Sequence, residues 1–241
     1  MTPCIFKTQA HTHLAHLAAA QTNRATQSSQ KSQISTRTLM TKQEDLIGPH
    51  PPHPNQFNSW LNPTDHPHSN TKCHRELNEK IPVTDANLLD WLARKLIYHH
   101  YTEDRIAKLK LKYGQLGFPK YAEQHRKLPR ADRTMKGNAT EIILIEYIEG
   151  SQHKALIKAF KLRYNPNVDQ AIKGDDTLLV DIYNDGKKDR VKLFLGESKF
   201  RQKPTKAAVD EISDSLKTTK NPLSYSFLIE ELYRDATTTA T

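Results

Sequence analysis

The residues with the clearest chemical potential are two carboxylates and a lysine, Asp176, Glu197 and Lys199. Asp176 stands just before an apolar run at 177–183, and the other two follow a second apolar run at 190–195. Neighbouring carboxylates repel each other unless a cation lies between them, and Mg²⁺ takes oxygen ligands of this kind together with a substrate phosphate. A lysine beside them can hold a phosphate oxygen or orient the attacking water. These residue types therefore indicate metal-dependent phosphate chemistry, if the fold brings them together.

A β-hairpin would bring them together. Residues 184–188 (NDGKK) separate the two apolar runs and are typical of a tight turn, because glycine adopts positive φ. If Asp185 faces Lys188, then Asp176 lies opposite Glu197. The same register pairs Leu178 with Leu195, Val180 with Leu193 and Ile182 with Val191. Because side chains alternate along a strand, all of these residues and Lys199 then lie on one face of the hairpin. A slip of the register by one residue would separate them. The alternative is a surface hairpin with solvated charges.

Glu141 is a third candidate carboxylate, on a helix predicted over 138–149. This helix is apolar on most sides, as expected of a helix buried against a sheet. Glu141 has two interpretations: it completes a capping box with Asn138, which would make it structural, or it approaches the metal site. Glu146 on the same helix is the competing acidic residue.

The remaining elements are predicted from apolar spacing and turn residues. Helices are expected over 84–97, 102–114, 121–128 and 204–216. A first strand is expected over 155–164, ahead of the hairpin, and residues 221–234 leave room for at most one short strand or helix. The second half of the chain therefore reads as helix, three strands and helix.

This order of motifs resembles the PD-(D/E)xK nuclease superfamily, which has a helix-borne Glu, a strand-borne Asp often after Gly-x, and Glu-x-Lys on the next strand. Gly174-Asp175-Asp176 and Glu197-Ser198-Lys199 match the second and third parts. The run from about 74 to 234 is similar, more specifically, to the HamA nuclease subunits of Hachiman anti-phage defence systems. The stretches that carry this resemblance are KGNATE at 136–141, GDDTLLVD at 174–181 and GESKF at 196–200.

The resemblance implies an α+β fold with a restriction-endonuclease-like core, a mixed sheet flanked by helices. It implies a DNA endonuclease that uses Mg²⁺, with Mn²⁺ as a substitute. Asp176, Glu197 and the backbone carbonyl of Ser198 are then the expected metal ligands, and Glu141 and Lys199 complete the catalytic set. A helicase subunit of the HamB type is the implied partner.

The N-terminal part of the chain differs in composition. Residues 1–73 are rich in Gln, Ser, Thr, His and Pro, which predicts a disordered low-complexity tail. The basic start of this tail fits either an organellar transit peptide or sequence upstream of a start at Met40. A helical layer is expected over 74–135, a nuclease core over 136–235 and a tail over 236–241. The core is expected to be truncated at its C-terminal end, because the family's chains continue further.

A loose set of possible zinc ligands also falls in the N-terminal region. Zinc needs four ligands at useful spacing, and a solvated tract is favoured over a metal site. The residues concerned are His50, His53, His66, His68, Cys73 and His74.

The formal net charge of +9 favours a polyanionic partner, usually nucleic acid. Basic residues are frequent from 105 to 136, without a recognisable base-reading helix, so phosphate contacts with weak sequence preference are expected. An RNA-directed nuclease and a non-catalytic nucleic-acid-binding or assembly subunit are the alternatives. Cys4 and Cys73 imply no disulfide framework, and no apolar run reaches the length of a membrane span, so a cytoplasmic protein is expected.

Overall fold

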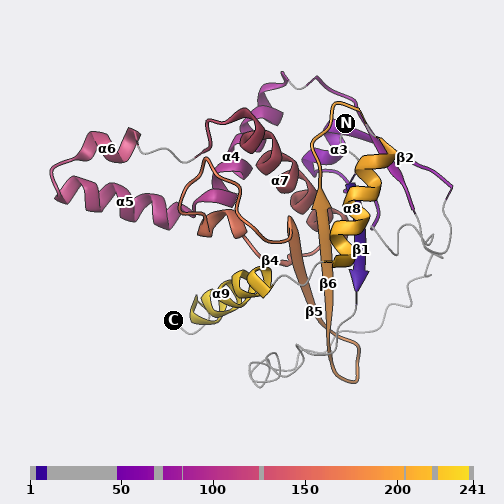
Figure 1. The fold of residues 1–241 in the computed structure, drawn as a ribbon. Coiled ribbons are helices and arrows are strands. Elements are labelled where there is room, and N and C mark those ends of the chain that lie inside the picture. The colour runs from indigo at the N-terminus through magenta and orange to yellow at the C-terminus, as the bar shows by residue number, and fades with distance from the viewer. Residues whose placement is uncertain are drawn as a thin grey trace.

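A four-stranded antiparallel sheet lies between helices in the computed structural model of the chain (Figure 1). The structure describes residues 4–9, 48–67, 73–82, 84–124, 128–203, 205–218 and 222–238. The strand order is β1-β6-β5-β4, and every pairing among the described residues is antiparallel. The fold is therefore α+β as expected, but the expected mixed sheet is wrong for the part of the chain that is described.

The predicted hairpin forms the centre of this sheet. Its strands are β5 (Thr177–Asn184) and β6 (Asp189–Ser198). In the turn, the Asp185 N–H donates to the Lys188 carbonyl at 3.2 Å. The expected register is confirmed, with Leu178 opposite Leu195, Val180 opposite Leu193 and Ile182 opposite Val191. The edge strands are β1 (Cys4–Gln9) beside β6 and the two-residue β4 (Ile157–Lys158) beside β5.

The two faces of the hairpin bury different helices, as strand alternation requires. One face packs Leu178 and Leu193 against Phe227 and Leu228. These last two belong to the helix α9 (Pro222–Thr238), and α8 (Lys206–Thr218) lies along the same sheet. The opposite face packs Leu179 and Phe194 against α7 (Asp132–Gln152), through side chains that include Leu144, Ile145 and Ile148. The site-bearing strands are thus held from both sides.

Helix α7 is the central helix, buried against the sheet on one side and against a second layer on the other. It begins at Asp132, six residues before the start expected from the sequence, and Ala131 gives no side-chain cap. The proposed capping box of Asn138 and Glu141 is therefore wrong, because both residues lie inside the helix. The Asn138 side chain instead contacts the ring of His100, Nδ2 to Nε2, at 3.0 Å.

The second layer contains α3 (Gln56–Trp60), a two-stranded sheet of β2 (Leu61–Asp65) and β3 (Arg75–Glu79), and α4 (Ala86–His100). Phe57, Leu61 and Tyr147 form its buried contact with α7. The tail expected over 1–73 therefore includes folded segments, namely β1, α3 and β2. Residues 10–47, which include Met40, lie outside the described residues.

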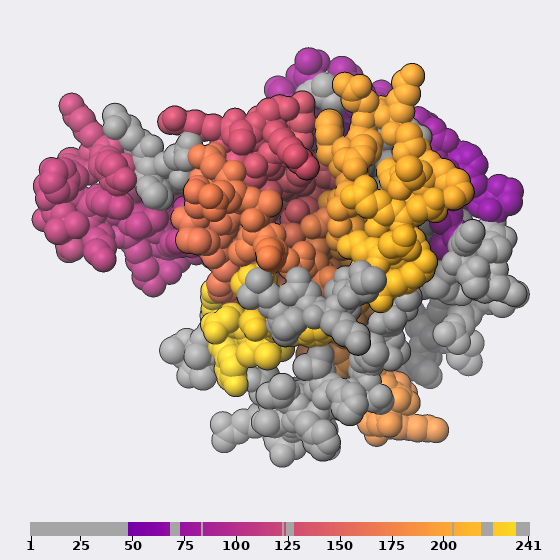
Figure 2. Space-filling model, viewed as in Figure 1, coloured from indigo at the N-terminus to yellow at the C-terminus, as the bar shows by residue number. Residues whose placement is uncertain are grey.

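Two helices form an arm that projects from the body of the molecule (Figures 1 and 2). They are α5 (Glu103–Gln115), capped by the Thr102 hydroxyl, and α6 (Pro119–Gln124). None of the residues of α5 is buried. No helix in the described ranges is both long and apolar enough to cross a membrane.

Two expected elements differ in the structure. The strand predicted over 155–164 ends at Lys158, and the chain then turns into a 3₁₀ helix, η2 (Lys161–Tyr164). The last segment, expected to hold a short element at most, forms the 17-residue helix α9. Both differences affect the surroundings of Asp176, because η2 carries Lys161 to its side chain and α9 binds the backbone of the preceding residue.

Candidate active site

The hairpin register brings Asp176 beside the end of β6. Asp176 directly precedes β5, and its Oδ2 accepts two hydrogen bonds from Ser198, from the backbone N–H at 2.9 Å and from the hydroxyl at 3.1 Å. The neighbouring Glu197 is nine per cent exposed. The sequence therefore predicted correctly that these strand ends meet.

Lys199 lies beside the second carboxylate. Its Nζ is 2.8 Å from Glu197 Oε1 and 3.5 Å from Oε1 of Glu211 on α8. A quarter of the Lys199 side chain is exposed, so its ammonium group can reach a substrate as well as Glu197. Glu-x-Lys thus forms an ion pair at the edge of the buried region.

Glu141 reaches the same place from α7, through a lysine that sequence analysis missed. The Lys161 Nζ lies 3.0 Å from Glu141 Oε2 and 2.9 Å from Asp176 Oδ1. Lys161 is five per cent exposed. In the strand predicted for this stretch Lys161 was one of several interspersed basic residues, whereas the turn of η2 carries it inward. The predicted set of three acids and Lys199 is therefore joined by a second lysine, Lys161.

Burial and charge set the protonation of these acids. Burial raises the pKa of Glu141 to about 8, although Lys161 opposes the shift. Burial alone would also raise the pKa of Asp176, but the charge of Lys161 and the hydrogen bond from Ser198 hold it below its usual value. Burial, followed by the negative charge of Asp176, raises the pKa of Glu197. Near neutral pH, Asp176 is therefore the ionised partner of Lys161.

Glu146 lies in a separate buried network. Its Oε1 accepts from the ring of His99 at 2.7 Å and from Lys158 at 3.1 Å, and Lys95 pairs with its other oxygen. Burial opposes ionisation of Glu146, but these donors outweigh it and lower its pKa. The structure thus brings Glu141, and not Glu146, to Asp176.

The loop before β5 is fixed in an unusual backbone conformation. Gly174 has φ +131°, a value that L-residues with side chains rarely adopt. The next residue, Asp175, donates its N–H to the Ser224 hydroxyl of α9 at 2.7 Å. The Asp175 Oδ2 atom is buried without a hydrogen-bond partner. The loop that presents Asp176 is therefore anchored to the last helix.

The donor set suits a hard divalent cation in part. Asp176 directly before β5 and Glu197 near the end of β6 offer carboxylate oxygens, which Mg²⁺ accepts, and the Ser198 carbonyl is adjacent in sequence. Lys161 and Ser198 already engage both oxygens of Asp176. Within the described ranges, no group of three or more His, Cys, Asp or Glu side chains is arranged to hold an ion. A cation would thus require a shift of these contacts.

The possible zinc ligands do not converge among the residues described. His66 and His74 stack at 4.5 Å between ring centroids, and His66 Nε2 lies 3.3 Å from Glu76. His50 contacts the Tyr147 hydroxyl instead. His68 falls outside the described residues.

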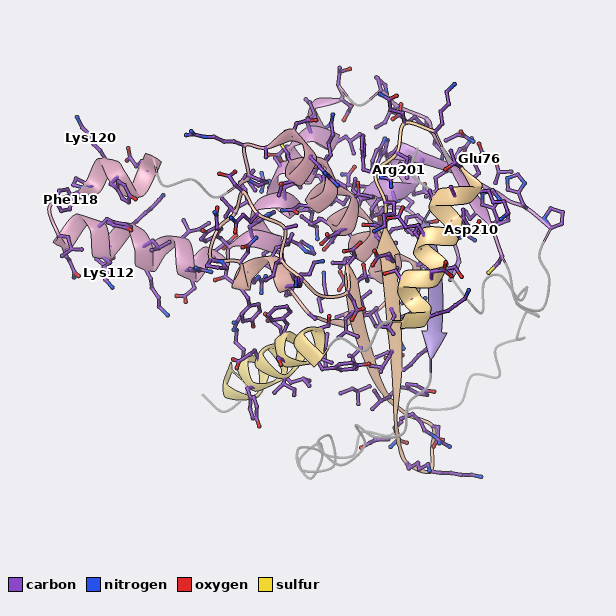
Figure 3. All side chains as sticks on the ribbon, viewed as in Figure 1. Glu76, Lys112, Phe118, Lys120, Arg201 and Asp210 are labelled. Carbon is purple, nitrogen blue, oxygen red and sulfur yellow. The ribbon has the colours of Figure 1, made fainter. Side chains whose placement is uncertain are left out.

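Cationic side chains gather along the projecting arm where it faces the body of the molecule. They line a hollow of about 730 Å³ between α5, η2 and α9, and are Arg105, Lys108, Lys112, Arg163 and Arg234. Further along the arm lie Phe118 and Lys120, and Arg201 lies in the connection from β6 to α8 (Figure 3). The basic residues expected to track phosphates thus lie partly on an exposed projection.

The fold and the site define an α+β protein whose central hairpin presents Asp176, Glu197 and Lys199 beside Glu141 of α7. Comparison with known proteins gives the family. The family model for HamA matches residues 54–240, so the chain belongs to the HamA family. It is 37% identical over 198 residues to the Hachiman protein HamA of Bacillus cereus, a match that spans 80% of this chain and 69% of the relative. No solved structure matches the chain.

Proposed function

We propose that this HamA chain is a Mg²⁺-dependent DNA endonuclease of a cytoplasmic anti-phage defence system, with Mn²⁺ as a substitute. The observation that supports this most is the convergence of Glu141, Asp176, Glu197 and Lys199 from α7 and the two hairpin strands. These are residue types that metal-dependent phosphodiester hydrolysis uses, in the order that the superfamily resemblance implies. The HamA family membership supports the defence role.

Asp176, Glu197 and the Ser198 carbonyl are the proposed metal ligands. The bound ion would lower the pKa of a coordinated water and offset negative charge on the attacked phosphate. Lys199, which is partly exposed and paired with Glu197, is proposed to hold a phosphate oxygen or to orient the water. Hydrolysis is expected to leave a 5′-phosphate and a 3′-hydroxyl.

Basic side chains along the projecting arm where it faces the body of the molecule are proposed to contact the DNA backbone. Phosphate contacts give affinity without sequence information, so cleavage should depend little on sequence. A helicase subunit of the HamB type is the proposed partner that supplies or restrains the substrate.

A second candidate function is a non-catalytic nucleic-acid-binding or assembly subunit. The observation that favours it is the engagement of both Asp176 oxygens by Lys161 and Ser198, which leaves this acid satisfied without a cation. Steeply salt-dependent binding without cleavage would select this alternative.

Cleavage of supercoiled, linear and single-stranded DNA, and of RNA, with Mg²⁺ or with EDTA, tests the proposal. The wild type should nick DNA only with Mg²⁺. Glu197→Gln and Lys199→Ala should abolish nicking while DNA binding persists. Asp210→Asn removes an exposed carboxylate of α8 that pairs with Lys206, and should cleave as the wild type does. Equal nicking by the wild type and both site variants would refute the assignment, and cleavage of RNA alone would replace DNA as the substrate.

A further inference from the structure

Lys161 fills the space between Glu141 and Asp176. Its ammonium group is within 3.0 Å of an oxygen of each, and six per cent of its side chain is exposed. The stem of the lysine passes Gly174, where an added Cβ would lie 3.8 Å from Lys161 Cδ. The side chain is therefore enclosed by the loop that presents Asp176, and is not a surface lysine that happens to lie near a carboxylate.

A buried ammonium group must be paired, because its desolvation costs far more than an exposed ion pair returns. Lys161 meets this requirement through the carboxylate of Asp176 and a second contact with Glu141, and both acids belong to the candidate active site. Lys158, the other lysine that bridges two acids from this segment, does so away from the site, between Glu146 and Glu149. The segment from β4 to η2 thus carries two comparable lysine bridges, and only that of Lys161 involves proposed catalytic residues.

The ammonium group and a divalent ion compete for the same oxygen. Lys161 contacts Oδ1 of Asp176, while Oδ2 faces Ser198 at the end of β6. A metal bound to Oδ1 would sit within a few ångströms of the ammonium charge, and the two cations would repel strongly in a site of low effective dielectric. A metal on the β6 side of Asp176, toward Glu197, must displace the hydrogen bonds from Ser198 and the ion pair of Lys199 with Glu197. Lys199 is a quarter exposed and can move aside, whereas Lys161 is enclosed.

We propose that Lys161 is a permanent cation of this site, which occupies the position between Glu141 and Asp176 and thereby limits the site to one divalent metal, shared by Asp176 and Glu197. This inference rests on the proposed metal-dependent function. Lys161 is a positioning residue here: it holds Glu141 and Asp176 together and denies the space between them to a second ion.

Calorimetric titration of the full chain with Mn²⁺ is the direct test. The wild type should bind one equivalent, and binding of two would overturn the inference. Glu197→Gln should lose that equivalent, because the proposed metal lies on the Glu197 side. Absence of any Mn²⁺ binding would instead refute the proposed metal-dependent function, so the two failures are distinguishable.

Thermal unfolding of lysine variants gives a second readout that needs no activity. Without metal, Lys161→Gln should have a lower melting temperature than the wild type. Mn²⁺ should raise the melting temperature of this variant by more than it raises that of the wild type. In the calorimetric titration, the same variant should bind a second equivalent of Mn²⁺. Lys161→Arg keeps the charge and should keep a single equivalent. Lys158→Gln is the matched control, which should lose stability without gaining metal, because Lys95 and His99 still pair with Glu146. An unchanged Mn²⁺ response in Lys161→Gln would overturn the inference. If that variant does not fold, the wild-type stoichiometry decides.

Discussion

The hydroxyl of Ser224 in α9 accepts a hydrogen bond of 2.7 Å from the backbone N–H of Asp175, the residue before Asp176. Ser224 is two per cent exposed, so this N–H has no access to water as a substitute partner. The helix at the far end of the chain thereby positions the loop of the candidate active site.

Replacing Ser224 with Ala should destabilise the protein, because it leaves the Asp175 N–H buried without an acceptor. The expected loss in free energy of unfolding is about 1–3 kcal/mol, measured by urea denaturation. Ser226 is exposed on the same helix, and its replacement by Ala should cost less stability than Ser224→Ala does. Equal effects of the two changes would show that the Asp175 hydrogen bond contributes nothing.

Glu141→Gln should alter how stability depends on pH. The pKa of Glu141 is about 8 in the folded chain, above its ordinary value of 4.5. Between these values the folded state binds the proton and the unfolded state does not, so Glu141 makes stability fall as pH rises. Glu141→Gln cannot ionise and should become progressively more stable than the wild type from pH 5 to pH 8. A constant difference in free energy of unfolding over this range would contradict the shift.

His99 should make stability depend on pH in the opposite direction, so that stability falls as the pH is lowered. Burial lowers the pKa of His99 to about 4 from 6.5, despite the adjacent Glu146. The unfolded state then binds the extra proton as pH falls through 6.5, so the wild type loses stability on acidification. Relative to His99→Gln, the loss from pH 7 to pH 4 should be on the order of 3 kcal/mol. A difference in free energy of unfolding between the wild type and His99→Gln that stays constant from pH 7 to pH 4 would contradict the lowered pKa of His99.

Two glycines near the site should respond to alanine with opposite signs. A Cβ on Gly196 in β6 would lie 3.0 Å from Thr177 Cβ and 3.1 Å from Leu144 Cδ2, so Gly196→Ala should destabilise by about 1–3 kcal/mol. Gly137 lies inside α7 with no atom within 4 Å of an added Cβ. Gly137→Ala should therefore stabilise, by up to about 1 kcal/mol, since alanine favours the helix. Denaturant midpoints of the two variants decide the signs.

Lysines on the arm should contribute to DNA affinity by neutralising phosphates. Lys108→Gln with Lys112→Gln should weaken binding to unrelated DNA sequences by similar factors. The slope of log affinity against log salt should become shallower by about 2, because each lysine is expected to neutralise one phosphate. Lys217→Gln on α8 is an exposed control and should bind as the wild type does. An unchanged slope in the double variant would remove the arm from the proposed DNA surface.

The hairpin was predictable from the sequence because its determinants are local. The turn residues and the alternating apolar side chains fix one register, and that register alone brings Asp176 to the end of β6. The choice between Glu141 and Glu146 was not predictable in this way. The two lie about 140° apart around a helix that is buried on nearly every side, so the sequence does not show which side faces the carboxylates.

Other features of the site depend on interactions between distant segments. The apparent capping box at Asn138 fits the local pattern, but α7 begins earlier and includes it. Lys161 lies among apolar and basic residues that suggest a strand, and only the early end of β4 at Lys158 reveals its inward position. The pairing of β1 with β6 joins residues almost two hundred positions apart, and no local signal predicts it.

The isolation of the arm has a practical consequence. The turn between α5 and α6 contains Leu116 and Phe118, which are 59% and 64% exposed. Neither residue supports the buried sheet. This tip is therefore a suitable attachment point for a fluorophore that reports nucleic-acid docking without disturbing the hairpin.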